Sequence, residues 1–168
     1  GVKPIIGCEV YVAAASRLTK DGKGGGYYHL VLLAENNEGY KNLIKLVSYG
    51  FIDGFYYKPR VDKELLRKYH KGIIASSACL AGEVARNILT VSYDEAKDAA
   101  LEYLDIFGEG NFFLELQDHG MREQKQVNMA LVRMSEETGI PLIATNDSHY
   151  IYKEDAEPHD ILLCIQTG

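Results

Sequence analysis

The residues best suited to chemistry lie in Pro141–Tyr150, where an apolar stretch runs directly into polar side chains. Residues two apart in an extended segment point to the same side. Asp147 and His149 would therefore present a carboxylate oxygen and an imidazole nitrogen together where a strand ends. Such a pair suits a divalent metal ion such as zinc or manganese. The alternative is that Asp147 caps a following helix and His149 is an ordinary surface residue, and an isolated Asp-x-His pair favours that alternative.

Other potential metal ligands recur in or just after the remaining predicted strands. Glu9 and His29 lie within strands, whereas Cys79 and His119 each follow one. Parallel α/β folds gather their chemistry at the carboxyl ends of strands, and in a barrel these positions converge on one rim, as a multinuclear metal site requires. Taken singly, each residue has an ordinary interpretation: a solvent-facing carboxylate, a satisfied core histidine, a small buried thiol or a polar turn. Their recurrence at strand ends favours the metal site.

Hydrophobic periodicity and capping signals predict the elements that must position these residues. Asp62 and Ser92 are predicted N-caps, and Gly139 is predicted to end a long helix. The alternation of strands and helices predicts an α/β fold with a mainly parallel sheet, either a barrel or a doubly wound sheet. The Gly-rich segment 22–26 lacks the Gly-Lys-Ser/Thr ending of a phosphate loop. The predicted strands cover residues 3–13, 27–34, 72–75, 111–117 and 142–145, and the predicted helices cover 38–49, 62–70, 81–89, 93–107, 122–138 and 154–166.

Composition limits the classes of function. The 168 residues suffice for about one domain with a proper core, and 46% hydrophobic and 25% charged residues are typical of a globular protein. No apolar run approaches the ~20 residues needed to span a bilayer. Three widely spaced cysteines argue against a disulfide framework and for a reducing, cytoplasmic compartment. The net charge of −6 gives no basic footprint for nucleic acid, so any such contact must be local or come from another part of a larger protein.

Several segments, in this order along the chain, resemble the polymerase-and-histidinol-phosphatase (PHP) domain. The resemblance is to the version at the amino terminus of bacterial replicative DNA polymerase III α subunits in particular. The segments are GVKPIIGCEVY (1–11), YHLVLLA (28–34), NEGYKNL (37–43), SSACLAGE (76–83), LELQDHG (114–120) and ATNDSHY (144–150). The resemblance covers essentially the whole chain and implies a distorted, TIM-like barrel of mainly parallel strands, with a metal cluster on the carboxyl-end rim.

The resemblance also implies a ligand set. Carried over residue by residue, the family's metal ligands fall on Glu9, His29, Cys79, Asp147 and His149. They would hold zinc or manganese, up to three ions in a complete domain, and His119 is expected on the substrate side or behind the ligands. The family's first ligands come from a His-x-His motif and an Asp-His pair that would precede Gly1. We therefore expect residues 1–168 to be a PHP domain truncated on its amino-terminal side, with a parent chain that continues toward a polymerase core.

The function that the resemblance implies is DNA replication by a DNA-directed DNA polymerase, with magnesium as the polymerase cofactor and DNA and other replicase subunits as partners. The domain itself would be a metal-dependent phosphoesterase, a proofreading 3′–5′ exonuclease with Asp147 and His149 in its catalytic centre. The excerpt alone is expected to be inactive. One alternative is a non-catalytic scaffold that braces the polymerase and docks partners. Another is a free-standing phosphatase, such as one acting on histidinol phosphate.

Overall fold

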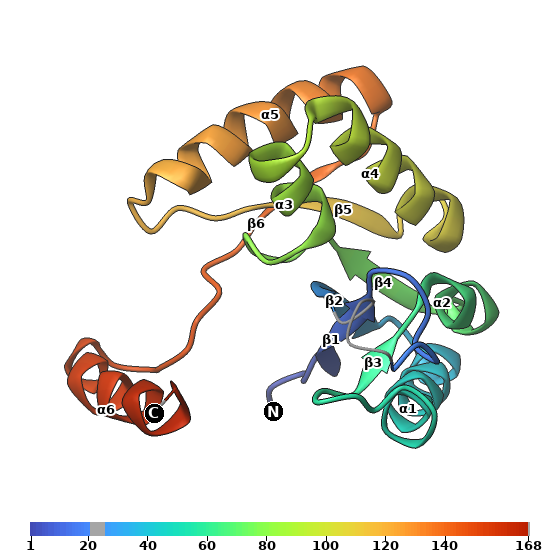
Figure 1. Ribbon diagram of the computed structural model, residues 1–168, viewed down its shortest axis with the longest axis horizontal. Coiled ribbons are helices and arrows are strands. Elements are labelled where there is room, and N and C mark those ends of the chain that lie inside the picture. Colours follow the sequence, from blue (N-terminus) through green and yellow to red (C-terminus); the bar gives the residue numbers. More distant parts are fainter. Residues whose placement is uncertain (21–25, 168) are drawn as a thin grey trace.

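The structure of the chain, a computed structural model, describes residues 1–20 and 26–167 (Figure 1). Most of the Gly-rich segment 22–26 lies outside these residues. The strands are β1 (Gly7–Ala13), β2 (Tyr27–Ala34), β3 (Arg60–Val61), β4 (Ile73–Ser76), β5 (Phe112–Leu116) and β6 (Leu142–Ala144). The helices are α1 (Asn37–Ile52), α2 (Lys63–Tyr69), α3 (Glu83–Thr90), α4 (Tyr93–Phe107), α5 (Arg122–Thr138) and α6 (Ala156–Thr167), with a 3-10 turn η1 (Lys153–Asp155) before α6.

The predicted strands and helices are all present, and the capping predictions are confirmed. The Asp62 carboxylate accepts a hydrogen bond from the backbone N–H of Leu65 at 3.0 Å. The Ser92 hydroxyl accepts one from Glu95 at 3.1 Å, and Gly139 ends α5 in the left-handed conformation with φ 76°. The first strand begins at Gly7, not at Lys3. The sequence did not predict β3, because two residues in an irregular aromatic segment carry no periodic pattern.

The strands form one mixed sheet in the order β3-β1-β2-β4-β5-β6. β1 pairs in parallel with β3, as β4 does with β5 and β5 with β6, whereas β2 pairs antiparallel with both β1 and β4. Among the described strands, β2 therefore alone runs against the common direction. The prediction of a mainly parallel sheet failed at this strand because no helix separates β1 from β2 in the described residues, so the two strands fold back as a hairpin.

The expected TIM-like barrel is not observed. The strands β3 and β6 stand at the two ends of the pairing order, so the sheet formed by the described residues is open. The parallel strands β4, β5 and β6 nevertheless end at a common edge, and the segments that follow them carry Cys79, His119 and Asp147. An open sheet of this kind still positions the site, because the site needs only neighbouring strand ends.

The two faces of the sheet differ in character. Val10, Val12, Leu30 and Leu32 point to one face, where they are buried in a single hydrophobic core together with residues of the helices. Contacts with the strands come mainly from α1, α4 and α5. On the opposite face of the β1–β2 hairpin, Glu9 is exposed, and Tyr11 and His29 are half-buried. Polar ligands can therefore occupy this face without disturbing the core.

Helix α6 lies apart from the sheet, at the end of an extended segment that follows β6 (Figure 1, red). Its packing partners include η1 and, through the ring of His159, the rings of His149 and Tyr150. In the described ranges, no helix combines the length and the apolar character that crossing a membrane requires.

Candidate metal centre

Glu9, His29 and Cys79 form a compact group of metal-ligating atoms. One carboxylate oxygen, one imidazole nitrogen and the thiol sulfur all lie within 4.8 Å of one another. His29 Nδ1 is 3.1 Å from Glu9 Oε1 and 3.5 Å from Cys79 Sγ. Residues 9, 29 and 79 are distant in sequence, so this proximity is a product of the fold.

The register of the β1–β2 hairpin brings Glu9 and His29 together. Tyr11 lies directly opposite His29, and Glu9 lies opposite Val31, so Glu9 is the diagonal neighbour of His29. Side chains two apart on a strand share a face, and diagonal pairs lie within reach of long or aromatic side chains. The ring of Tyr11 also contacts that of His29 edge-on, with 5.3 Å between centroids, and this contact restricts the orientation of the imidazole.

A tight turn after β4 delivers Cys79 to the same place. Ala78 adopts a left-handed conformation with φ 60°, and the N–H of Gly82 donates to the carbonyl of Cys79 at 2.9 Å. The turn needs glycine at position 82, because an added Cβ would lie 2.1 Å from the carbonyl oxygen of Ser77. The backbone N–H of His29 donates to the carbonyl of Ala81 at 3.0 Å, so the turn is fastened to the strand that carries the imidazole.

His29 interacts electrostatically with both Glu9 and Cys79. Hydrogen bonds to Cys79 and to Glu9 raise the pKa of His29 to about 9, against the opposing effect of burial. The hydrogen bond from His29 lowers the pKa of Glu9, and the nearby charges of His29 and His149 act in the same direction. The group thus holds a positive charge between a carboxylate and a thiol. A divalent cation bound to the same atoms would take the place of that proton, because metal ligands must be deprotonated.

The loop after β6 carries Asp147 and His149. Asp147 adopts a left-handed conformation with φ 45°, an arrangement that Asp tolerates better than most residues. His149 Nδ1 is 2.7 Å from the backbone carbonyl of Asp147. Since a carbonyl only accepts, Nδ1 donates this hydrogen bond, and Nε2 is the ring nitrogen left to face a metal or a substrate.

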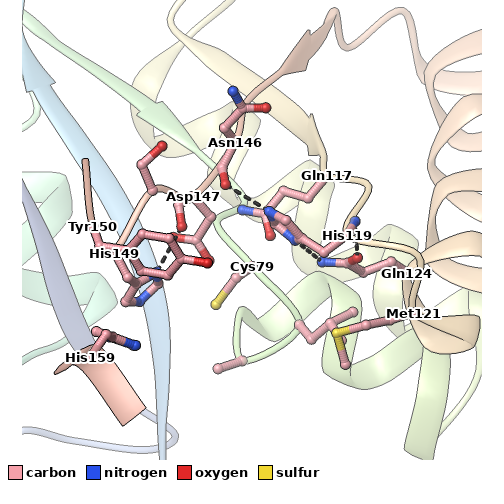
Figure 2. Close-up of a pocket in the computed structure, with 13 residues that line it drawn as sticks. Cys79, Gln117, His119, Met121, Gln124, Asn146, Asp147, His149, Tyr150 and His159 are labelled. Carbon is pink, nitrogen blue, oxygen red and sulfur yellow. Dashed lines mark hydrogen bonds between the residues drawn. The ribbon is translucent and has the colours of Figure 1, made fainter. Parts of the chain in front are cut away.

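A cavity of about 580 Å³ joins this loop to the Cys79 turn. Figure 2 shows Cys79, His119, Asp147 and His149 around it, and its other labelled residues are Gln117, Met121, Gln124, Asn146, Tyr150 and His159. The residues that line the cavity include several neutral polar side chains, but no lysine or arginine among the described residues. A negatively charged ligand in this cavity would need its charge balanced by bound cations.

The structure brings the predicted residues to one region, in two parts. Glu9, His29 and Cys79 form the compact group, and Asp147 and His149 line the cavity that opens from Cys79. In the described residues, Asp147 and His149 do not belong to the group whose ligand atoms lie within 4.8 Å of one another. Imidazole nitrogen, thiolate sulfur and carboxylate oxygen are the donor set that proteins use for zinc, so the compact group fits a divalent metal.

Two features of the site were not predicted from the sequence. His159 of α6 contacts the rings of His149 and Tyr150, with centroid distances of 5.8 and 5.4 Å. Gln117 and Gln124 are buried beside the cavity. A polar amide within or next to an apolar pattern was the sequence signal that could have indicated the two buried glutamines. Nothing in the pattern of α6 distinguished His159 from a surface histidine.

Comparison with known proteins places these observations in a family. The family model described as PHP domain matches residues 1–119, a range that includes Glu9, His29, Cys79 and His119. Curated relatives named DNA polymerase III subunit alpha align with the chain from end to end. The protein from Borreliella burgdorferi is 50% identical over 170 residues, covering 100% of this chain and 15% of its own length. The protein from Thermus aquaticus is 51% identical over 170 residues, covering 99% of this chain and 14% of its own length.

The chain therefore spans about one seventh of the length of these relatives, and Asp147 and His149 lie in the part that the relatives cover and the family model does not. Since the match extends over most of the chain, the chain belongs to the PHP domain family.

Proposed function

We propose that residues 1–168 act as the PHP part of a bacterial replicative DNA polymerase α subunit, and that the centre at Glu9, His29 and Cys79 hydrolyses phosphodiester bonds with the help of bound divalent ions. The observation that carries the hydrolytic role is the convergence of carboxylate, imidazole and thiol within 4.8 Å, at one end of a cavity that Asp147 and His149 also line. The polymerase assignment rests on the relatives named DNA polymerase III subunit alpha.

The donor atoms of each residue suggest its role. Glu9 and His29 would hold an ion together with Cys79, whose thiolate favours zinc over harder ions. When bound, clustered divalent ions would polarise the phosphate, lower the pKa of a bound water and stabilise the leaving oxygen. His149 presents Nε2 for a second ion or for the leaving group, and Asp147 adds a carboxylate on the same loop.

The shape and charge of the cavity favour the end of a single DNA strand as substrate. A volume of about 580 Å³ is within the range of pockets that take one small organic molecule, and a nucleotide is of that size. Neutral side chains of the lining such as Asn146 and Ser148 can donate to sugar and base atoms without attracting phosphate. Without a lysine or arginine in the described lining, phosphate binding would depend on the metal ions.

The proposal is tested on the full-length polypeptide that carries this chain. The protein is stripped with a chelator, and removal of a mispaired 3′ nucleotide and nucleotide addition are measured on the same labelled primer and template. We expect magnesium alone to restore nucleotide addition, whereas 3′ hydrolysis returns only after zinc or manganese is added.

Two results would contradict the proposal. If no hydrolysis appears with any of the three metals while zinc raises the melting temperature, the domain is a metal-stabilised scaffold. If zinc restores hydrolysis of histidinol phosphate but not of DNA, the substrate is a small phosphomonoester.

A further inference from the structure

His119 uses both of its ring nitrogens inside the protein. Its Nε2 lies 2.7 Å from the backbone carbonyl of Asn146, and its Nδ1 lies 2.8 Å from the side-chain amide nitrogen of Gln124 (Figure 2). The same Gln124 side chain accepts a hydrogen bond from the backbone N–H of His119 at 2.8 Å. The glutamine therefore holds His119 at two points.

These contacts fix the tautomer of His119. A carbonyl only accepts, so Nε2 carries a proton, and the Gln124 amide group donates to Nδ1, so Nδ1 does not. With both nitrogens engaged, His119 has no lone pair to offer a metal and no free site for proton transfer. It is unsuited to be a ligand or a general acid while these bonds persist.

The segment that His119 contacts needs support. The backbone N–H of Thr145 donates to the carbonyl of Leu116 at 3.1 Å, and the Thr145 hydroxyl donates to the buried Glu115 carboxylate at 2.5 Å. Beyond Thr145 the chain leaves the sheet, enters the left-handed turn at Asp147 and becomes exposed. Asn146 lies between Thr145, the last residue that the sheet fixes, and Asp147. The hydrogen bond from His119 to the Asn146 carbonyl therefore holds the chain just before the Asp147–His149 pair.

Gln124, which holds His119, belongs to a helix that packs in the hydrophobic core. Gln124 is only 5% exposed and lies near the start of α5, a helix that buries Val127, Leu131 and Met134 against the sheet. One helical turn later, Asn128 donates to the carbonyl of Gln117 at 2.9 Å and holds the end of β5 to the same helix. The path from α5 through Gln124 and His119 to Asn146 is therefore a continuous series of hydrogen bonds.

We propose that His119, held by Gln124, is a positioning residue that fixes the loop 146–149 and so places Asp147 and His149 for metal binding. The inference rests on the metal centre proposed above and adds a role for two residues outside it. A non-glycine residue in a left-handed turn costs free energy, so the loop keeps this conformation only while its neighbours constrain it.

The test compares the cobalt(II) affinity of variants with that of the wild-type full-length protein. Binding is measured by the thiolate-to-cobalt absorption of Cys79. His119→Phe keeps the ring shape but removes the donor to Asn146, and we expect it to weaken cobalt binding about 10- to 100-fold, as loss of a residue that orients ligands does. Gln124→Leu should have a similar effect. Gln124→Glu should restore near wild-type affinity, because a carboxylate accepts from Nδ1–H and the imidazolium still donates from Nε2.

A double-mutant cycle separates positioning from general destabilisation. In a variant that lacks both loop ligands, Asp147→Asn/His149→Ala, adding His119→Phe should cause no further loss of cobalt affinity, because its effect passes through those ligands. Amide hydrogen exchange of residues 146–150 in the metal-free protein should also be faster in His119→Phe, at an unchanged melting temperature.

The outcomes distinguish the inference from the proposed function. Wild-type affinity in His119→Phe, or an equal loss in the variant without loop ligands, would overturn the positioning role and leave the metal centre intact. A wild-type protein that shows no thiolate-to-cobalt absorption would overturn the metal centre, and the positioning role with it.

Discussion

Asp147→Asn or His149→Ala, made in the full-length polypeptide, should lower metal-dependent hydrolysis of DNA 3′ ends by at least about 100-fold. Each substitution replaces a proposed metal ligand. Loss of a group that only orients a ligand already lowers metal affinity or activity by about 10- to 100-fold. Nucleotide addition should stay near the wild-type rate, because we expect polymerisation to use carboxylates outside residues 1–168. Both activities are measured on one purified preparation, together with thermal unfolding.

Two matched substitutions outside the cavity serve as controls. Asp98→Asn alters an exposed carboxylate on α4, and His70→Ala removes the imidazole that lies at the end of α2. Both should leave hydrolysis unchanged. Hydrolysis that persists in Asp147→Asn and His149→Ala, at an equal folded fraction, would exclude these residues from the catalytic centre. A fall in melting temperature without any hydrolysis in the wild-type protein would favour the scaffold alternative.

Gly39→Ala should destabilise the domain by about 3 kcal/mol, although alanine is the better helix former. Gly39 lies in the first turn of α1, and a Cβ there would lie 1.7 Å from the carbonyl oxygen of Gly72. That carbonyl accepts a hydrogen bond from the backbone N–H of Glu35 at 3.0 Å, and Gly72 itself has φ 69°. Moving the Gly72 backbone away from the added Cβ would therefore break this bond. The clash therefore outweighs the gain in helix propensity.

Gly50→Ala in the same helix is the matched control. An added Cβ there meets its nearest atoms at 3.7 Å, which is ordinary van der Waals contact. It should stabilise the domain by roughly 0.5–1 kcal/mol, because alanine loses less conformational entropy in a helix. Denaturant unfolding of the two variants measures both effects. A stabilising Gly39→Ala would show that α1 does not approach the Gly72 turn as closely as described.

Local signals in the sequence predicted the helices and most strands correctly, and tertiary pairing accounts for the differences. The 3.6-residue spacing of apolar side chains and the caps at Asp62, Ser92 and Gly139 are local properties, so they could be predicted from one chain. The alternation in Tyr27–Ala34 is the same whichever way the strand runs, so the signal for the reversed direction of β2 was the absence of a predicted helix between residues 13 and 27. The barrel prediction came from family resemblance, and the pairing of the described strands leaves the sheet open.

In the candidate site, too, some features were predicted from the sequence and others depend on tertiary contacts. Residue types within and just after the strands predicted which side chains would lie near one another, and Glu9, His29 and Cys79 do form a compact group. The sequence did not predict the left-handed turns at Ala78 and Asp147, because alanine carries no signal for positive φ and aspartate carries only a weak one. It also left two roles open for His119, since only the contacts with Gln124 and Asn146 reveal that both ring nitrogens are engaged.

The most direct test of the metal centre is X-ray absorption at the zinc edge, recorded on the full-length protein loaded with zinc. We expect a sulfur neighbour at about 2.3 Å together with nitrogen or oxygen neighbours at about 2.0–2.1 Å. The sulfur signal should disappear in Cys79→Ser, while His70→Ala keeps it. A spectrum without sulfur, or one that Cys79→Ser leaves unchanged, would contradict the assignment of Glu9, His29 and Cys79 as a metal centre.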